Sequence, residues 1–428
     1  MKRTLIKDLK GLKEKEVLVK GWVYKIYELP NVTFVKLRDS SGIIQVVLEE
    51  KYCELKNEMS IQVTGSLVES KKAPGGLEIL ATSIKILGNT YYDILPFEIN
   101  KKKISASLET ILDNRAVSLR KPELRAVFKI QQEITNAFRE YLMSLEFTEI
   151  HTPKIISSST EGGSEMFTVN YFDRRAFLAQ SPQFYKQMMV GAGFERVFEV
   201  APAYRAELHN TYRHLNEYIS LDVEMGFIES YEDLMELEEG FLKHLFKHIN
   251  EKCEFELKLL GTQLKEIKPI PRIPLAKVHE ILQQEFGKAS PPGNIDAEGE
   301  VLISKWVKEK YDSDFIFLTK YPVSKRPMYA MPSPEDETLT DSFDLIYKGL
   351  EITTGGQRIH DYNMLKENII KFGLNPEDFK FYLDTFKYGM PPHGGLAIGL
   401  ERITMKILDL DNIREATLLP RDMKRLEP

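Results

Sequence analysis

A polar loop between two hydrophobic runs holds the residues of this chain that are best suited to chemistry. The runs FEVAPAY and ISLDVEMGF have the β-branched and aromatic content of strands, so residues 198–227 are predicted to form an antiparallel pair. The loop between them contains Arg205, Glu207, Arg213 and His214. Arginine offers phosphate oxygens a fixed fork of N–H donors. The loop therefore suits a polyphosphate substrate, although a surface hairpin of mixed charge is the ordinary explanation for such a sequence.

A second segment of matching chemistry lies far along the chain. Residues 392–402, PHGGLAIGLER, place glycines, a short apolar run and Arg402 directly before a helical pattern, ITMKILDL. Glycine lets the backbone approach a ligand closely, and arginine supplies charge. The chain contains no GxGxxG or GxxxxGK sequence, so any nucleotide is expected to bind without those glycine-rich loops.

The composition is that of a folded protein with two or three domains. The chain has 428 residues, of which 43% are hydrophobic and 29% charged, and its net charge is −6. This balance argues against a generally basic nucleic-acid coat, but a local basic face would suffice for RNA. Cys53 and Cys253 lie too far apart for a CxxC site. No apolar run approaches about 18 residues and the N-terminus lacks a signal-peptide core, so we expect a cytoplasmic protein without membrane contact.

Five short strand-like runs occupy residues 16–90, with turn chemistry at residues 29–31, 39–42 and 74–76. Five strands in about 75 residues predict a small β-barrel of the OB-fold type, in a domain of residues 1–95. Such barrels stack single-stranded bases on aromatic side chains. The candidates are Trp22, Tyr24, Tyr27 and Phe34, with Lys20, Lys25, Lys36 and Arg38 nearby. For Trp22 and most of the other aromatic residues, packing in the barrel core is the favoured interpretation.

Residues 96–121 are predicted to be a hinge or linker, and helical spacing begins at Glu123 and continues to residue 146. The next run, FTEIHTPKI, is predicted to be a strand, and it contains Pro153, which is tolerable only at an edge or a bulge. A helix is predicted over residues 231–250. Its His244 and His248 share one face, but no acidic partner follows in HExxH fashion, so a solvated face is favoured over a metal site. Residues 264–335 show no recognisable chemistry, and FYLDTFKYG, residues 381–389, is expected to be one of the strands of the last third.

Taken together, these segments resemble the class II aminoacyl-tRNA synthetases, with motif 1 near 137–154, motif 2 near 198–227 and motif 3 near 394–410. The runs SSSTEGGSEMF and FLAQSPQFYKQ, between residues 157 and 187, are similar to aspartyl-tRNA synthetases of the compact archaeal type, in subclass b. The resemblance implies an α+β protein: an OB-fold anticodon-binding barrel, and a catalytic domain over 122–428 whose antiparallel sheet is flanked by helices. It also implies a homodimer that forms through motif 1.

The resemblance further implies the residues of the active site. Those expected around L-aspartate are Glu161, Gln183, Lys186, Arg205, Asp222, Thr354 and Arg358. Those expected around ATP are Arg205, Glu207, Arg213, His214, Leu215, Glu351, Gly399, Leu400, Glu401 and Arg402. Arg205, Glu351 and Arg402 are the implied catalytic residues, and Glu351 with Thr354 would bind Mg²⁺ through oxygen ligands. Related enzymes often have serine where this chain has Thr354, and threonine provides the same hydroxyl ligand.

In the barrel, Phe34 and Gln45 match positions that stack on and hydrogen-bond to anticodon bases, whereas Val47 replaces an aromatic residue of relatives. Pro74 resembles enzymes that charge both tRNA(Asp) and tRNA(Asn), and Tyr24 fits neither the discriminating nor the relaxed pattern. The sequence therefore favours aspartate attachment to tRNA(Asp), with tRNA(Asn) as a second acceptor. An asparaginyl-tRNA synthetase, a non-charging RNA-binding paralogue and an ATP-dependent amidating enzyme remain alternatives.

Overall fold

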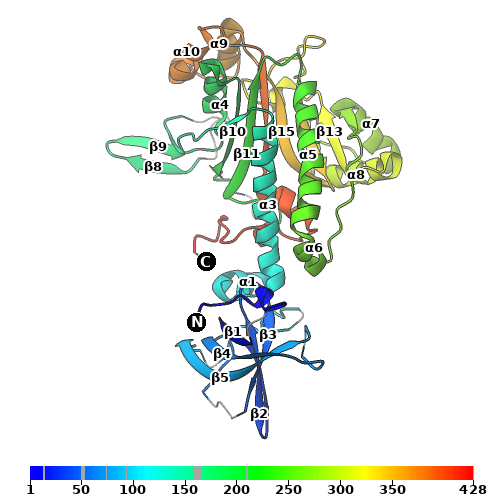
Figure 1. Cartoon of the computed structure of the whole chain (residues 1–428). Helices are drawn as coiled ribbons and strands as arrows, with labels where there is room; N and C mark the ends of the chain where they lie inside the picture. Colours follow the sequence, from blue (N-terminus) through cyan, green and yellow to red (C-terminus); the bar gives the residue numbers. More distant parts are fainter. Residues whose placement is uncertain are drawn as a thin grey trace. The chain divides into compact units, whose positions relative to one another are not determined.

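The computed structural model describes residues 1–12, 15–49, 54–73, 75–92, 94–101, 103–158, 166–208 and 211–427. The chain divides into two compact units, Met1–Val117 and Ser118–Pro428 (Figure 1). Each unit has its own hydrophobic core. Two short helices, α1 and α2, occupy part of the segment for which the sequence predicts a linker. Among the described residues, none of the helices combines the length and the apolar character that crossing a membrane requires.

The smaller unit contains a closed five-stranded barrel with the strand order β1-β2-β3-β5-β4, which confirms the predicted OB-fold. Its strands are β1 Glu16–Leu29, β2 Val32–Arg38, β3 Ile43–Leu48, β4 Ser60–Glu69 and β5 Leu77–Gly88. Buried and partly exposed residues alternate along β1, β2 and β3, because successive side chains of a strand point to opposite faces. The inward residues are aliphatic, as Val17, Val19 and Val23 of β1 illustrate.

The prediction that Trp22 and most other barrel aromatics pack in the core is wrong. The core consists of aliphatic residues and Met59, and Trp22, Tyr24 and Phe34 occupy the partly exposed positions between them. Tyr27 is 41% exposed. The strand period explains this result, since Val17, Val19, Gly21 and Val23 take the buried alternate positions of β1 and leave the aromatic residues between them facing outward.

The larger unit is organised around an eight-stranded sheet with the order β12-β13-β14-β15-β16-β11-β10-β6. The six central strands are antiparallel, as predicted, and the edge strands β12 and β6 pair in parallel. The strands are β6 Thr148–Glu149, β10 Arg196–Tyr204, β11 Glu217–Gly226, β12 Arg272–Pro274, β13 Phe315–Thr319, β14 Ser342–Tyr347, β15 Leu350–Arg358 and β16 His393–Gly399. The predicted hairpin is formed by β10 and β11. A separate three-stranded sheet contains β7 Ile155–Ile156, β8 Thr168–Tyr171 and β9 Arg174–Leu178.

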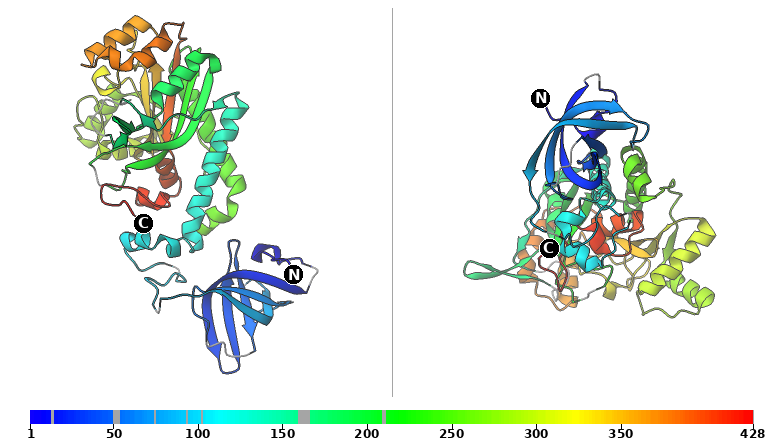
Figure 2. Two further views of the ribbon diagram at one scale, coloured as in Figure 1. Left: turned by 90° about the vertical axis from the view of Figure 1, so that its left-hand side faces the viewer. Right: turned by 90° about the horizontal axis from the view of Figure 1, so that it is seen from below.

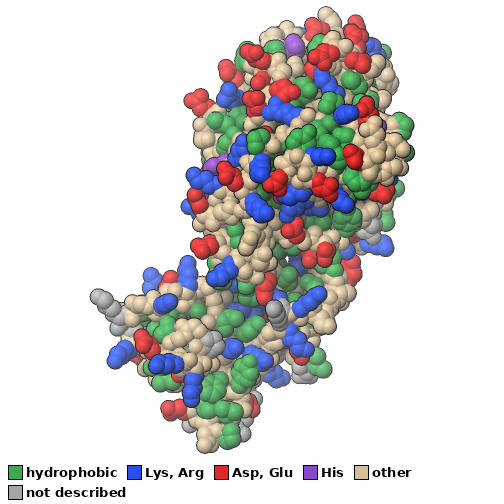
Figure 3. Space-filling view, turned by 90° about the vertical axis from the view of Figure 1, so that its right-hand side faces the viewer, with side chains coloured by type: hydrophobic (Ala, Val, Ile, Leu, Met, Phe, Trp, Pro, Cys, Tyr) green, Lys and Arg blue, Asp and Glu red, His purple; other side chains and the backbone are tan. Residues whose placement is uncertain are grey.

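The helices of the chain are α1 Leu108–Asp113, α2 Arg115–Ser118, α3 Pro122–Ser144, α4 Gln183–Met189, α5 Glu232–Lys252, α6 Glu254–Leu260, α7 Leu275–Phe286, α8 Ala297–Tyr311, α9 Tyr362–Lys371, α10 Lys380–Phe386 and α11 Leu400–Ile407. In the larger unit, α3 and α5 lie side by side against one face of the sheet, and with it they form the main core (Figure 2). α7 and α8 form a second core with β12, β13 and β14. On the face of this unit drawn in Figure 3, Lys and Arg side chains are interspersed with Asp and Glu side chains.

Two local predictions need correction. Residues 147–155 do not form one strand, because β6 ends at Glu149 and β7 begins at Ile155, and Pro153 lies between them outside both. Residues 380–386 form the helix α10 and not a strand. Its Tyr382, Leu383 and Phe386 pack with α4 and α9, so the helical spacing of these residues is the pattern that the structure uses.

Candidate active site

A β-bulge in β15 places Glu351 and Thr354 on the same side of the sheet. The pairing with β14 shifts its register here and leaves Ile352 as an extra residue. Ile352 packs in the core, and Thr353 donates a hydrogen bond from Oγ1 to the Glu238 carboxylate of α5 at 2.5 Å, so both face the helix layer. Residues three apart in a regular strand face opposite sides, and the bulge reverses that relation. Glu351 and Thr354 therefore line one cavity on the opposite face.

This cavity has a volume of about 120 Å³ and is bordered by β11, β15, β16 and the loop after β10. Most of the residues expected around ATP line it, namely Arg205, Glu207, Arg213, His214, Leu215, Glu351, Gly399, Glu401 and Arg402. Tyr218 and Ser220 of β11 also line it, at alternate positions of a regular strand. The loop and the C-terminal segments that the sequence singled out separately thus meet around one cavity.

Two of the expected ATP residues are placed differently from the rest. The Leu400 side chain packs in the hydrophobic core and does not line the cavity, so only its backbone could meet a nucleotide. Glu401 reaches the cavity wall, but its carboxylate is buried and accepts the backbone N–H of Ile219 at 3.1 Å. Burial raises the pKa of Glu401 to about 8, so this carboxyl is largely protonated at neutral pH and contributes little negative charge.

Arg213 is held by a carboxylate that the sequence analysis did not identify. Its Nη1 and Nη2 donate to the two oxygens of Glu300 at 3.0 and 2.7 Å, a paired geometry that fixes the guanidinium plane. Glu300 lies on α8, within the segment that showed no recognisable chemistry, and it also accepts the backbone N–H of Glu351 at 3.1 Å. α8 therefore joins the motif 2 loop to β15 through one side chain.

The remaining arginines of the cavity lie beside carboxylates in looser geometry. Arg402 Nη1 donates to the backbone oxygen of Glu351 at 2.9 Å and lies 3.4 Å from its carboxylate. Arg205 lies 3.7 Å from Glu207 and 5.6 Å from the ring centroid of Tyr218, and its side chain is 41% exposed. Such contacts in partly exposed positions are weak, so an incoming phosphate can replace them.

Four of the residues expected around aspartate, Gln183, Lys186, Asp222 and Arg358, form a second, buried cluster beside this cavity. Lys186 Nζ lies 3.0 Å from Asp222 Oδ1 and 3.4 Å from Glu224 Oε2. Arg358 Nε donates to Glu224 Oε1 at 3.2 Å, and its Nη2 donates to Gln183 Oε1 at 3.3 Å. These side chains come from α4, β11 and β15, and each residue is less than 8% exposed.

Glu224 is the residue of this cluster that the sequence analysis missed. Burial alone would raise its pKa, but Arg358 and Lys186 outweigh that effect and hold the pKa below its usual range. Gly395 makes room for this arrangement, because a Cβ there would lie 2.1 Å from Glu224 Oε2. The signal for Glu224 was present, since it follows Asp222 by two residues in a strand and must face the same side.

Asp344 was also missed, and it bears on the expected Mg²⁺ site. It lies directly opposite Thr354 in the pairing of β14 with β15, and Thr354 Oγ1 lies 3.3 Å from Glu351 Oε1. Burial raises the pKa of Asp344, and the nearby Glu351 charge adds to the rise against the opposing effect of Arg326. Asp344 Oδ1 accepts a hydrogen bond from Arg326 at 2.8 Å, so Glu351 and Thr354 are the oxygen ligands that remain for a hard cation here.

Some predicted residues lie elsewhere or cannot be placed. Glu161 and Pro74 lie outside the described residues. Phe34 and Gln45 occupy partly exposed positions on β2 and β3, and Gln45 Nε2 donates to Glu78 Oε2 at 2.8 Å. Arg38 lies near one of the candidate aromatic residues, as predicted, with its guanidinium 5.2 Å from the Tyr24 ring centroid, and it is buried in an ion pair with Glu58 at 2.7 Å.

A family model described as class II tRNA synthetases (D, K and N) matches residues 107–423, and a second, described as an OB-fold nucleic acid binding domain, matches residues 17–87. The chain belongs to the class II tRNA synthetases. This synthetase is 47% identical to the aspartate–tRNA(Asp/Asn) ligase of Thermus thermophilus over 428 residues, which is all of both chains. It is 45% identical to the aspartate–tRNA(Asp) ligase of Pyrococcus furiosus over 97% of each chain.

Solved synthetase structures share its fold. The asparaginyl-tRNA synthetase of Pyrococcus horikoshii, complexed with asparaginyl-adenylate, superposes with a TM-score of 0.92 at 30% identity over all of both chains. The aspartyl-tRNA synthetase of Entamoeba histolytica gives a TM-score of 0.88 at 33% identity, over 100% of this synthetase and 93% of the other chain. Because aspartyl and asparaginyl enzymes match about equally well, the fold alone does not identify the amino acid, and the side chains of the buried cluster must do so.

Proposed function

We propose that this protein is an aspartate–tRNA ligase. It joins L-aspartate to ATP as aspartyl-adenylate with release of pyrophosphate, and then transfers the aspartyl group to tRNA. The observation that carries the proposal is the buried cluster of Lys186, Arg358 and Glu224, which lies beside the phosphate-binding cavity. The names of the relatives that are 43–47% identical over nearly the whole chain support the same conclusion.

The charges of the cluster explain a preference for aspartate over asparagine. Lys186 and Arg358 carry two positive charges, and Asp222 and Glu224 carry two negative charges. When Asp222 pairs with the ammonium group of the substrate, two cations remain opposite one carboxylate. A substrate side-chain carboxylate balances that surplus, whereas the amide of asparagine leaves a buried cation uncompensated.

Catalysis requires no covalent nucleophile from the protein. The α-carboxylate of aspartate attacks the α-phosphorus of ATP, and pyrophosphate leaves in line. Arg205 would hold the carboxylate against the α-phosphate, while Arg213 and Arg402 would hold the far phosphates, so that acceleration comes from positioning and charge stabilisation. Mg²⁺ on Glu351 and Thr354 would neutralise phosphate charge. A terminal hydroxyl of tRNA then displaces AMP from the adenylate.

The barrel supports a role in tRNA recognition. Phe34 lies directly opposite Tyr27 in the pairing of β1 with β2, and Lys25 Nζ lies 4.9 Å from the Tyr27 ring centroid. Aromatic and cationic side chains on one barrel surface suit stacked bases and their phosphates. We extend the proposal to both tRNA(Asp) and tRNA(Asn), on the basis of Pro74 and the names of several relatives, and to a cytoplasmic homodimer formed through motif 1.

Pyrophosphate exchange tests the amino-acid assignment. Exchange should depend on aspartate and should fall by at least 100-fold with asparagine at equal concentration. Exchange driven only by asparagine would support the asparaginyl alternative, and no exchange with either amino acid would support a non-charging paralogue.

Charging assays with purified tRNA test the second assignment independently. Radiolabelled aspartate should be attached to both tRNA(Asp) and tRNA(Asn). In a separate test of the homodimer, sedimentation at assay concentrations should give twice the chain mass of 49.4 kDa. Charging of tRNA(Asp) alone would restrict the enzyme to one acceptor and leave the aspartate assignment intact.

A further inference from the structure

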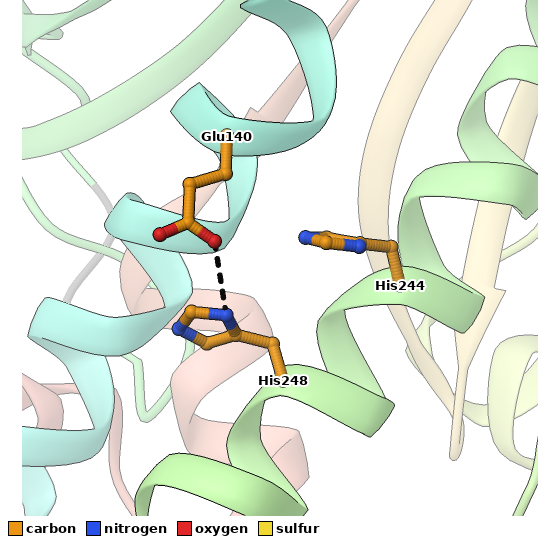
Figure 4. A group of neighbouring side chains, drawn as sticks. All are labelled: Glu140, His244 and His248. Atoms are coloured by element: carbon orange, nitrogen blue, oxygen red, sulfur yellow. Dashed lines mark ion pairs between the residues drawn. The ribbon is translucent and has the colours of Figure 1, made fainter. Parts of the chain in front are cut away.

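A cluster of metal-ligating side chains lies between α3 and α5, in the helix layer on the face of the sheet opposite the active site. Figure 4 shows the carboxylate of Glu140, on α3, facing the imidazole rings of His244 and His248, on α5. One ligand atom of each residue lies within 4.8 Å of the other two. Among the residues that the structure describes, no other group of three His, Cys, Asp or Glu residues meets this condition.

The sequence prediction of a solvated helix face is wrong here. His248 is only 6% exposed, because α3 packs over this face of α5. Histidines four residues apart share one helix face, as the sequence indicated. The acidic partner, however, comes from α3, more than 100 residues earlier, so no local motif could reveal it.

His248 lies between two carboxylates. Its Nε2 lies 2.9 Å from Glu133 Oε2, and its Nδ1 lies 3.2 Å from Glu140 Oε2. A neutral imidazole has one N–H and one lone pair. If the N–H points to Glu133, the lone pair on Nδ1 faces the oxygen of Glu140, and two acceptors repel each other unless a cation lies between them.

His244 supplies a third donor atom. Its Nε2 is shielded from solvent and has no hydrogen-bond partner, and its ring lies 5.6 Å from that of Tyr141 on the opposing helix. Burial lowers the pKa of His244, and the neighbouring His248 lowers it further. A buried ring nitrogen with no hydrogen-bond partner can offer its lone pair to a metal.

We propose that Glu140, His244 and His248 bind a divalent transition-metal ion of the Zn²⁺ type, which joins α3 to α5. Two imidazoles and one carboxylate are a common ligand set for zinc, with water in the fourth position. Glu133 would orient His248 by accepting its other N–H, as carboxylates do behind metal-bound histidines.

The geometry requires only a small adjustment. Zinc bonds of about 2 Å place tetrahedral ligand atoms roughly 3.3 Å apart. The His248 and Glu140 atoms already have that separation. The Glu140 side chain is 56% exposed and can rotate toward His244.

A proton on His248 is the competing explanation, since imidazolium could donate to both carboxylates. That arrangement needs Glu133 and Glu140 but gives His244 no role. The two explanations therefore differ in what the replacement of His244 should do.

The test uses the full-length protein, freed of metals by a chelator and then held in saturating Mg²⁺, so that the oxygen ligands of the active site are occupied. Zn²⁺ binding is measured by calorimetry and by metal analysis after gel filtration. We expect one Zn²⁺ per chain and a rise of a few degrees in Tm at roughly 100 times Kd. Co²⁺ should add the visible absorption of a site with nitrogen ligands.

His244→Ala and, separately, Glu140→Ala should each lower Zn²⁺ affinity by at least 10-fold and abolish the rise in Tm. His279→Ala is the matched control and should bind normally, because His279 is a partly exposed residue of α7 whose imidazole hydrogen-bonds to the backbone oxygen of Asn294 at 2.9 Å. Glu140 is half-exposed, so its variant should fold even if the histidine variant does not. Absence of Zn²⁺ binding in the natural protein, or unchanged binding in both variants, would overturn the proposal.

Discussion

The buried cluster proposed to bind the amino acid and the cavity proposed to bind phosphate hold their charged side chains in different ways. Lys186, Glu224 and Arg358 are buried and pair with one another at fixed positions. Arg205 and Arg402 are partly exposed and contact their carboxylates loosely. This difference fits the proposed function, in which selection of the amino acid depends on buried side chains that already pair with one another. In the same proposal, phosphate binding depends partly on Arg205 and Arg402, whose loose contacts ATP can replace, while Arg213 stays paired with Glu300.

The largest effect is expected from Lys186→Met, which removes a buried cation from two buried carboxylates. Breaking such a group should lower the free energy of unfolding by about 3–5 kcal/mol and abolish aspartate-dependent exchange. Denaturant unfolding measures the first effect. Lys243→Met, an exposed lysine paired with Glu239 on α5, is the control and should change stability by less than about 0.5 kcal/mol. Equal losses in the two variants would remove the distinction between buried and exposed pairs.

On the phosphate side, Arg205→Ala should slow the reaction without unfolding the protein. The loss of one preorganised donor to the transition state typically costs about 10²–10³ in kcat, and this side chain is 41% exposed, so Tm should change little. Exchange kinetics and thermal melting measure the two effects. Arg196→Ala, at the exposed first residue of β10, the strand that leads into the Arg205 loop, should retain normal kcat. A large fall in Tm for Arg205→Ala would show that its role is structural.

The buried carboxyl of Glu238, on α5, allows buried and exposed acidic residues to be compared by their effect on the pH dependence of stability. Burial raises the pKa of Glu238 to about 8. Between about pH 4.5 and 8 the unfolded chain loses a proton that the folded chain keeps, so stability falls as pH rises. In the natural protein, this proton should lower the free energy of unfolding by on the order of 3 kcal/mol between pH 4.5 and pH 8. The variant Glu238→Gln should not show this loss. Denaturant unfolding across this pH range is the measurement, and Glu236→Gln, exposed on the same helix, should keep the natural slope.

The smallest effect is expected from Glu300→Gln, which weakens the partner of Arg213. If Glu300 positions Arg213 for ATP, KM for ATP should rise about 5-fold, equivalent to about 1 kcal/mol, with kcat nearly unchanged. Glu298→Gln, an exposed residue of α8 paired with Lys288, should change neither constant. A fall in KM would mean that Glu300 competes with phosphate for Arg213.

The sequence alone predicted those parts of the protein that depend on patterns among neighbouring residues. The barrel strands, the β10–β11 hairpin and the arginines that line the cavity follow from alternation, turn residues and motif resemblance. Glu300 was missed because its partner Arg213 is 87 residues away, and no spacing rule connects α8 to that loop. Asp344, a lone carboxylate in the apolar run SFDLIY, did carry a signal, because an unpaired charge is rarely buried. The barrel aromatics also carried a signal, because Trp22 and Tyr24 alternate with the buried Gly21 and Val23 along β1, and alternate residues of a strand face opposite sides.

The extra residue at Ile352 has a consequence for how this protein can vary over evolutionary time. Substitutions along β15 change one side chain at a time, and many are compatible with the strand. If one residue were deleted at the bulge, the side chains of β15 on one side of the deletion would turn to the opposite face of the sheet. Either Glu351, or Thr354 and Arg358, would then face the helix layer. The side chains of β15 can therefore change one at a time during evolution, whereas the number of residues in the strand cannot.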